Sequence, residues 1–347
     1  MGSRVGNISF NIRAMVRRNK GAICTLGLIL LSNPIFTSAQ DAQKPVPSDT
    51  TIRVSTNRVS VGVTVEGTHR HFIKDLSRND FRIYDNGIEQ ELTNFLPIEE
   101  PAQVVLLVES GPAALFLRPS LLQAAETFLG GISSTDRVAI VSYSISPVLE
   151  LDFTTDKTEA GRALMSLNFM IGFAQQNLLS SVATTLDWLG SLPGKKTIVI
   201  LSTGVDDSAS NDWQLIQPKL SASDVHILAV STAGALRKPA KRKKLSPDER
   251  AERKHLKEGF VAADRLLSQI TGATGGHAYF PKNPKEFTDA YAEIAEFVRN
   301  EYLLEFAPPS EDGQLHSLKV RVAASWSHLN YRQAYLAPAP ATPAAPR

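Results

Sequence analysis

Apolar and polar residues alternate strictly over residues 59–65, where every second residue is valine. This period of two is typical of a strand with one buried face. The period returns over 80–84 and, after a turn-forming Asp-Asn-Gly sequence at 85–87, over 91–96. We therefore expect residues 51–97 to form a small β unit, with 91–96 as a return strand.

A different pattern covers residues 101–300, where short, uninterrupted apolar runs alternate with stretches of helical spacing. Such runs are typical of strands that are buried on both faces of a parallel sheet. The runs lie at 104–108, 138–143, 197–201, 225–230 and 277–280. The helical stretches lie at 119–129, 156–167, 178–190, 211–221, 259–271 and 285–299. With an alternating edge strand at 148–153, this order predicts an α/β domain with a doubly wound, mostly parallel sheet.

The period of two returns beyond the α/β domain, at 302–306, 315–322 and 328–335. Neither these strands nor the N-terminal ones are numerous enough to bury a core on their own. We therefore expect the segments 51–97 and 301–336 to form one small β lobe, although the α/β domain separates them in sequence. The tail rich in Ala and Pro, 337–347, is expected to be disordered.

Residues 1–39 contain the three parts of an export signal in the usual order. A basic stretch ends at Lys20, an apolar run covers 22–31, and a small Thr-Ser-Ala sequence at 37–39 precedes the polar segment 40–50. This order predicts cleavage after residue 39, a linker over 40–50, and a periplasmic or extracellular protein. An uncleaved membrane anchor is the alternative, although the apolar run is shorter than the roughly 20 residues that span a bilayer. The Sec and twin-arginine routes both stay open.

The composition narrows the class of protein. The chain has 347 residues, of which 43% are hydrophobic and 21% charged, as expected of a globular protein. Its net charge is +2, but residues 1–39 hold five basic residues and no acid, so the rest of the chain is net negative. This balance argues against a nucleic-acid partner. The single cysteine, Cys24, lies in the export signal, so the mature chain is expected to have no disulfide and no thiol site.

One segment of the α/β domain, 237–258, is strongly basic, with ten Lys or Arg residues and four acids. It contains no aromatic residue, so stacking on the bases of single-stranded nucleic acid is not supported. We expect a solvated loop that continues into a helix starting after Pro247. A contact with an anionic surface is the alternative.

Three phrases follow one another along the chain. The first, at 74–87, reads Lys-Asp-Leu-Ser-Arg-Asn-Asp-Phe-Arg-Ile-Tyr-Asp-Asn-Gly. The second, at 273–281, reads Ala-Thr-Gly-Gly-His-Ala-Tyr-Phe-Pro, and the third, at 302–306, reads Tyr-Leu-Leu-Glu-Phe. In order and spacing they resemble the bacterial von Willebrand factor type A-related proteins typified in acidobacteria, over about residues 50–336. The resemblance implies a von Willebrand factor A-like α/β domain.

Domains of this kind usually bind Mg²⁺ in a metal-ion-dependent adhesion site at the carboxyl ends of the strands. The resemblance implies oxygen ligands from an Asp-x-Ser-x-Ser loop, from a Thr on a second loop and from an Asp on a third. This chain departs from that pattern at every position. Glu109 replaces the first Asp, and Gly111 and Ala113 replace the two Ser residues, unless a shorter loop brings Ser110 into the first Ser role. Asn177 and Thr203 stand at the positions of the Thr and the last Asp.

We therefore predict a vestigial metal site whose loops form a ligand-binding surface. Its residues are Glu109, Ser110, Asn177, Thr203, Asp206 and Asp207. No metal, no cofactor and no catalytic residue is expected, and the partner is expected to be a protein, as for an adhesion or scaffolding module. One alternative is a Mg²⁺-dependent adhesin in which Glu109, Asp206 and Asp207 are the ligands. The other alternative is a cell-envelope hydrolase.

Two further motifs are explained by structure rather than chemistry. His69 and His71 are spaced like a metal-binding pair on a strand, but the sequence at 66–68 (Glu-Gly-Thr) favours a hairpin connection. The glycine-rich sequence 271–276 resembles a phosphate-binding loop, yet it follows a predicted helix and precedes a strand, whereas such loops need the opposite order. No serine lies in a nucleophile-elbow sequence, so nothing in the sequence indicates an enzyme.

Overall fold

A computed structural model of the chain describes residues 58–67, 71–111, 123, 125–169, 175–207, 212–236, 246–323 and 327–339. All of them belong to one compact unit, Val54–Arg347. The predicted export signal (1–39) and linker (40–50) lie outside the described residues. So do His69, part of the basic segment (237–245) and most of the C-terminal tail (340–347).

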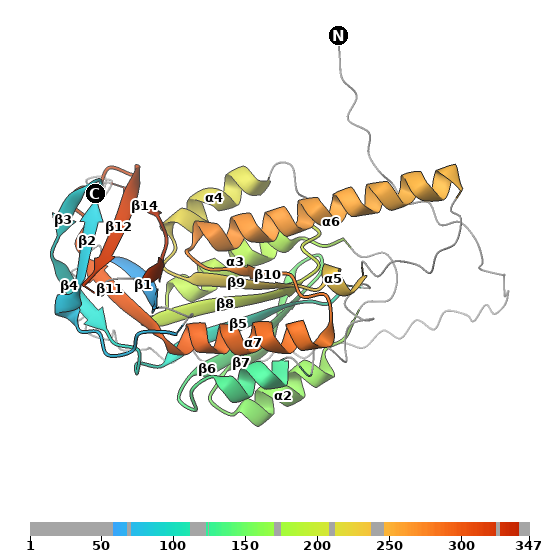
Figure 1. The fold of residues 1–347 in the computed structure, drawn as a ribbon, viewed down its shortest axis with the longest axis horizontal. Helices are drawn as coiled ribbons and strands as arrows, with labels where there is room; N and C mark the ends of the chain where they lie inside the picture. Colours follow the sequence, from blue (N-terminus) through green and yellow to red (C-terminus); the bar gives the residue numbers. More distant parts are fainter. Residues whose placement is uncertain are drawn as a thin grey trace, which may run out of the picture. The chain divides into compact units, whose positions relative to one another are not determined.

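The described residues contain a six-stranded sheet with the strand order β10-β9-β8-β5-β6-β7 (Figure 1). The strands are β5 (Ala102–Glu109), β6 (Arg137–Tyr143), β7 (Pro147–Thr154), β8 (Lys195–Ser202), β9 (His226–Ser231) and β10 (Ala278–Tyr279). All neighbours pair in parallel except β6 and β7, which are antiparallel and place β7 at an edge. The predicted doubly wound, mostly parallel sheet is confirmed, and so is the edge strand.

Helices cover both faces of this sheet (Figure 1). One face packs against residues 125–131, α2 (Lys157–Ser166) and α7 (Pro284–Arg299). The other packs against α3 (Leu178–Gly190), α4 (Asp212–Ala222) and α6 (Pro247–Ala273), and a short helix, α5 (Ala233–Leu236), follows β9. Successive residues of β5 alternate between the two cores, with Val104 and Leu106 in one and Val105 and Leu107 in the other. A strand with a core on each side needs apolar residues at every position, which explains the unbroken apolar runs.

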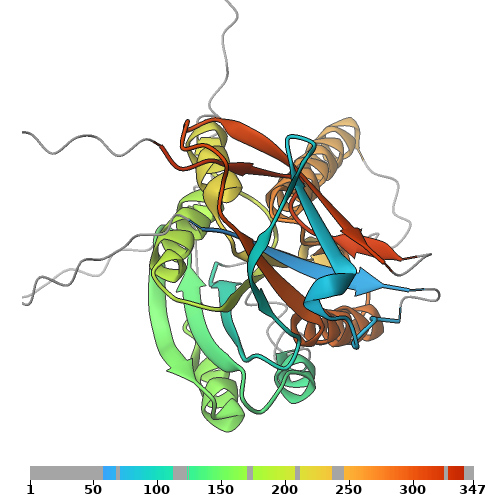
Figure 2. The same ribbon diagram turned by 90° about the vertical axis from the view of Figure 1, so that its left-hand side faces the viewer.

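The N- and C-terminal strands form one β lobe made, within the described residues, of two four-stranded sheets (Figure 2). One sheet has the order β13-β1-β11-β4, with β1 (Val59–Glu66), β4 (Leu92–Leu96), β11 (Glu301–Phe306) and β13 (His328–Asn330). The other has the order β14-β12-β2-β3, with β2 (Phe81–Asp85), β3 (Ile88–Gln90), β12 (Leu315–Val322) and β14 (Ala334–Leu336). A short 3-10 helix, η2 (Arg78–Asp80), precedes β2. Because β1 pairs with β11, and β2 with β12, the predicted shared lobe is confirmed.

Two strand predictions within the lobe are wrong in detail. The return strand of β2 is β3, whereas 92–96 crosses to the other sheet and pairs with β11 as β4. The ring of Phe95 on β4 lies 5.8 Å from that of Phe81 on β2, so the apolar faces of these strands meet across the lobe core and not side by side. The predicted strand 328–335 is divided into β13 and β14, which belong to different sheets. The chain bends between them, where Arg332 is buried.

Helix α6 begins at Pro247, close to the predicted start after that residue, and continues through the predicted helical stretch 259–271 to Ala273. Every described side chain from 246 to 258 is exposed, which fits the expected solvated segment. The glycine-rich sequence after it ends the helix: Gly275 has a φ of 77°, and the amide of Gly276 donates to the carbonyl of Thr271 at 2.9 Å. No helix in the described parts of the chain is both long and apolar enough to cross a membrane.

Candidate functional site

The six predicted site residues meet at the carboxyl ends of the parallel strands. Strand β5 ends at Glu109, and Thr203 directly follows β8, its neighbour in the sheet. Asn177 directly precedes α3, and its backbone N–H donates to the carbonyl of Ser144, the residue after β6, at 2.8 Å. Parallel strands end at the same edge of a sheet, so residues far apart in sequence come together there.

Glu109 is the buried centre of this edge, with 2% of its surface exposed. Its Oε2 atom accepts three hydrogen bonds: from Ser202 Oγ at 2.9 Å, from the Thr203 amide at 2.6 Å and from Thr203 Oγ1 at 2.8 Å. Burial raises the pKa of this carboxyl, and the three hydrogen bonds oppose that rise because they favour the charged form. Glu109 is therefore a structural acceptor between β5 and the end of β8.

A buried tyrosine extends the same network to β6. The hydroxyl of Tyr143 donates to Ser202 Oγ at 2.6 Å, and the Gly204 amide donates to that same oxygen at 2.8 Å. Burial, with Glu109 nearby, raises the pKa of Tyr143 well above its ordinary value, so it stays a neutral donor. Ser110 is held in turn by the Tyr143 carbonyl, which accepts from the Ser110 amide at 2.8 Å and from its Oγ at 3.0 Å.

The two aspartates fix the start of α3. Asp206 Oδ2 accepts from the Leu179 amide at 2.7 Å, and Asp207 Oδ2 accepts from the Gln176 amide at 2.7 Å. The side chain of Asn177 does not cap the helix, because its Nδ2 donates to the Ile145 carbonyl at 2.8 Å. A helix N-terminus favours a negative partner, so Asp206 supplies from another loop the acceptor that Asn177 does not.

These contacts differ from the ligand set that the resemblance implies for Mg²⁺. Mg²⁺ needs oxygen lone pairs in octahedral geometry at about 2.1 Å. In this structure the Oε2 of Glu109 and the Oδ2 atoms of Asp206 and Asp207 already accept hydrogen bonds from N–H or O–H groups of the protein. The described residues contain no group of three or more His, Cys, Asp or Glu side chains that could hold a metal ion.

Exposed apolar side chains lie beside the polar residues of this edge. Glu109, Ser110 and Thr203 are buried, whereas Asn177 and Asp206 are partly exposed and Asp207 is exposed. Beside them, Ile145 is 54% exposed and Val205 is 36% exposed. We call this set, Ile145, Asn177, Val205, Asp206 and Asp207, the carboxyl-edge surface. That it binds a ligand stays a prediction.

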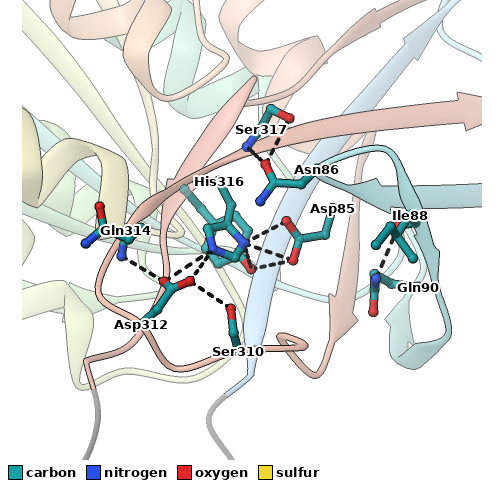
Figure 3. A network of polar contacts seen from close by, with 10 residues as sticks. Asp85, Asn86, Ile88, Gln90, Ser310, Asp312, Gln314, His316 and Ser317 are labelled. Carbon is teal, nitrogen blue, oxygen red and sulfur yellow. Dashed lines mark hydrogen bonds and ion pairs between the residues drawn. The ribbon is translucent and has the colours of Figure 1, made fainter.

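A second polar cluster, in the β lobe, was not predicted from the sequence (Figure 3). His316 on β12 lies between two carboxylates: its Nδ1 is 2.8 Å from Asp85 Oδ1, and its Nε2 is 3.2 Å from Asp312 Oδ2. Tyr335 donates to Asp85 Oδ2 at 3.0 Å. Burial alone would lower the pKa of His316, but the hydrogen bonds to Asp312 and Asp85 outweigh it and raise that pKa.

This cluster ties strands together and does not resemble a nucleophile with its base. Both ring nitrogens of His316 face carboxylates, and the Tyr335 hydroxyl, which lies 3.3 Å from Nδ1, is buried and donates to Asp85. The nearby Ser310 donates to Asp312 at 3.0 Å and not to the imidazole. Nothing in the sequence signals this contact, because Asp85 lies in a turn-forming sequence and its partner His316 is 231 positions later in the chain.

Comparisons with known proteins give likenesses in structure alone. Neither a family model nor a curated protein matches the sequence. An aerotolerance-related membrane protein from Bacteroides fragilis is similar at 13% identity over 57% of this chain and 98% of its own, with a TM-score of 0.43. A von Willebrand factor type A protein from Catenulispora acidiphila is similar at 11% identity over 76% of each chain, with a TM-score of 0.43. The pilus adhesin SpaC from Lactobacillus rhamnosus GG has 10% identity over 78% of this chain and 49% of its own, with a TM-score of 0.42. These values are too low for a function to be carried over to this chain.

Proposed function

We propose that this chain is an exported protein-binding module, related to von Willebrand factor type A domains, that binds its partner through the carboxyl-edge surface without a metal ion and without catalysis. The proposal that binding needs no metal ion rests on the hydrogen bonds and the burial of Glu109. Its carboxylate is buried and accepts three hydrogen bonds from Ser202 and Thr203. The position that would bind a cation in the resembling family instead joins two strands.

The character of the carboxyl-edge surface supports a protein partner. Ile145 and Val205 are exposed next to Asp206 and Asp207, and such a combination of apolar and charged side chains suits the core and rim of a modest protein interface. The loops that carry these residues are tied to one another: the Asp207 amide donates to the Gln176 carbonyl at 2.8 Å, and Asn177 Nδ2 donates to the Ile145 carbonyl at 2.8 Å. Loops fixed in advance lose less conformational freedom when a partner binds.

Position-specific cross-linking tests this proposal. A photoreactive amino acid is placed at Val205 in the full chain, and a matched variant carries it at Leu315, which is exposed on the β lobe. In cells of the source organism, the Val205 variant should form an adduct with one defined protein that the Leu315 variant does not form. The yield should be unchanged in EDTA.

Two outcomes would contradict the proposal in different ways. The same adducts from both positions, or none from Val205, would refute the carboxyl-edge surface as a binding surface. An adduct that EDTA abolishes and Mg²⁺ restores would favour the Mg²⁺-dependent adhesin instead. No observation favours the hydrolase.

A further inference from the structure

A cavity of about 590 Å³ lies where the α/β domain faces the β lobe. Helices α3 and α4 supply one side, including Leu186 and Lys219, and the lobe supplies the other, including Val59 and Leu336. Cavities of this size are in the range that holds small organic ligands. The carboxyl-edge surface is at the other end of α3, which at 13 residues is about 20 Å long.

One wall of the cavity contains a buried arginine, Arg332, with only 4% of its surface exposed. Its guanidinium donates to three backbone carbonyls: that of Ser221 in the last turn of α4, that of Ser223 just after α4, and that of Ser60 on β1, at 2.7 Å. Its Nε atom has no hydrogen-bond partner among the described residues. Burial lowers the pKa of Arg332 to about 10, and the negative charge of Asp224 only partly opposes this fall.

The other charged residues that line the cavity already have partners of opposite charge. Asp187 lies 2.5 Å from Lys219 Nζ, and Asp224 lies 2.7 Å from Lys196 Nζ. Arg58 lies 3.5 Å from Glu305. Among the described charged residues of the lining, Arg332 is therefore the one without an anion in direct contact. A buried cation in that state is costly, and an anion that reached its guanidinium would relieve the cost.

The other residues that line the cavity indicate the chemical character of the rest of the ligand. Val59, Leu186, Leu336, Ala337 and Pro338 present apolar groups to the cavity. We propose that the cavity is a binding site for a small organic carboxylate, whose anionic group contacts the Arg332 guanidinium and whose apolar body lies against Leu186, Leu336 and Pro338. Arg binds carboxylates strongly because its N–H groups match the two oxygens in charge and in spacing. This site is separate from the carboxyl-edge surface, and it holds whether or not that surface binds a protein.

Binding of three probe carboxylates, acetate, hexanoate and phenylacetate, to the full chain tests the site, with phenylacetamide as the neutral match of phenylacetate. Ligand-observed NMR with titration gives the affinities. Hexanoate and phenylacetate should bind saturably, acetate more weakly because it lacks the apolar body, and phenylacetamide at least tenfold more weakly than phenylacetate. The proposal is overturned if none of the carboxylates binds at a probe concentration of 10 mM, which is roughly ten times a Kd of 1 mM (about −4.1 kcal/mol). It is also overturned if phenylacetamide binds as well as phenylacetate.

Variants at other positions test whether the probes bind in this cavity. They are needed because removal of the buried Arg332 could unfold the region where the α/β domain meets the β lobe. A side chain added at Gly190, which lines the cavity, would meet nothing within 4 Å, so Gly190→Trp can fill the cavity without a clash at its Cβ. Gly130→Trp is the matched control, because its Cβ also meets nothing and it lies outside the lining. Gly190→Trp should reduce phenylacetate affinity at least tenfold, while Gly130→Trp leaves it unchanged. Arg332→Lys keeps the positive charge but removes the planar set of guanidinium N–H donors, so it should also weaken phenylacetate binding. Equal binding by the two Trp variants would overturn the assignment.

Discussion

His226 Nδ1 lies 2.7 Å from Glu301 Oε1, and both side chains are almost fully buried where the α/β domain meets the β lobe. The two atoms are close enough for an ion pair, although their orientation does not meet the geometry of a hydrogen bond. His226 begins β9 and Glu301 begins β11, so the pair links the two parts of the fold directly. Gly62 on β1 lies against it: a Cβ there would come within 2.0 Å of Glu301 Oε1 and 2.7 Å of His226 Cε1.

The first prediction follows from this contact. Gly62→Ala should lower the free energy of unfolding by about 1–3 kcal/mol, because a methyl group must displace two buried polar side chains. Gly259→Ala is the control with the opposite sign: its Cβ meets nothing, and Ala is the better helix former by up to about 1 kcal/mol. Urea unfolding measures both. A Gly62→Ala variant as stable as the parent would show that the pair moves aside without cost.

The second prediction concerns the response to Mg²⁺. A ligand that binds the native state alone stabilises it by about 2.7 kcal/mol at a hundredfold excess over its Kd. One oxygen of each of the carboxylates of Glu109, Asp206 and Asp207 accepts a hydrogen bond from the protein. We therefore expect 10 mM Mg²⁺, which is about a hundred times the Kd of a typical weak site, to leave the melting temperature unchanged. Glu109→Ala should lower the free energy of unfolding by about 3 kcal/mol, equally with and without Mg²⁺, because it leaves buried donors unpaired. A Mg²⁺-dependent rise in the melting temperature that Glu109→Ala abolishes would contradict this prediction.

The third prediction is a pH dependence that His316 confers on the β lobe. Its pKa in the folded protein is raised by the hydrogen bonds to Asp312 and Asp85, against the effect of burial, relative to about 6.5 in the unfolded chain. The stabilisation is therefore fully present below about pH 6.5 and is lost as pH rises through the folded pKa. His316→Gln should consequently reduce the free energy of unfolding more at pH 5.5 than at pH 9 (test values on either side of about 6.5). His328→Gln, at an exposed position, should show no such difference. Equal effects at the two pH values would rule out a charged His316.

The fourth prediction is removal of residues 1–39. The basic stretch, the apolar run and the Thr-Ser-Ala sequence at 37–39 predict that the mature chain begins at Gln40. N-terminal sequencing of the protein from fractionated cells of the source organism tests this directly. The full-length chain with Met1 in the cytosolic fraction would contradict the prediction, and the full-length chain in the membrane fraction would favour the uncleaved anchor.

The pattern of apolar residues predicted the architecture because that pattern is itself a consequence of burial. Val104 to Val108 contact a core on each side, and Val59 to Val65 face one core, so the two periods distinguish the sheet types. The pattern could not assign partners to strands of equal character, which is why 91–96 was placed next to β2. The pairing of β4 with β11 defines that arrangement, and Phe95 then meets Phe81 across the lobe core.

The candidate site was predictable in its location but not in its hydrogen bonds. The ends of β5 and β8 follow from the apolar runs, so Glu109 and Thr203 could be brought together from sequence. The sequence did not predict that the carboxylate of Glu109 accepts from Thr203, or that the carboxylate of Asp206 accepts from the start of α3. These contacts depend on side-chain directions, which the spacing of residues along the chain does not encode. The His226–Glu301 pair left one local signal, because a glycine in the middle of a valine-rich strand indicates close approach of another group, and Gly62 is such a glycine.

The pairing of β1 with β11 makes the α/β domain, in topological terms, a large insertion within the β lobe. Ser60 on β1 donates to Glu305 on β11, which is 245 positions later in the chain. Contacts of such long sequence separation close slowly, whereas the α/β domain is formed by segments that are closer together in sequence. During synthesis the domain can therefore fold while the valines of β1 still lack their partner strand. The last strands to be made then complete the lobe, so a ribosome-bound chain that stops before β11 would hold a folded domain preceded by an unpaired, aggregation-prone strand.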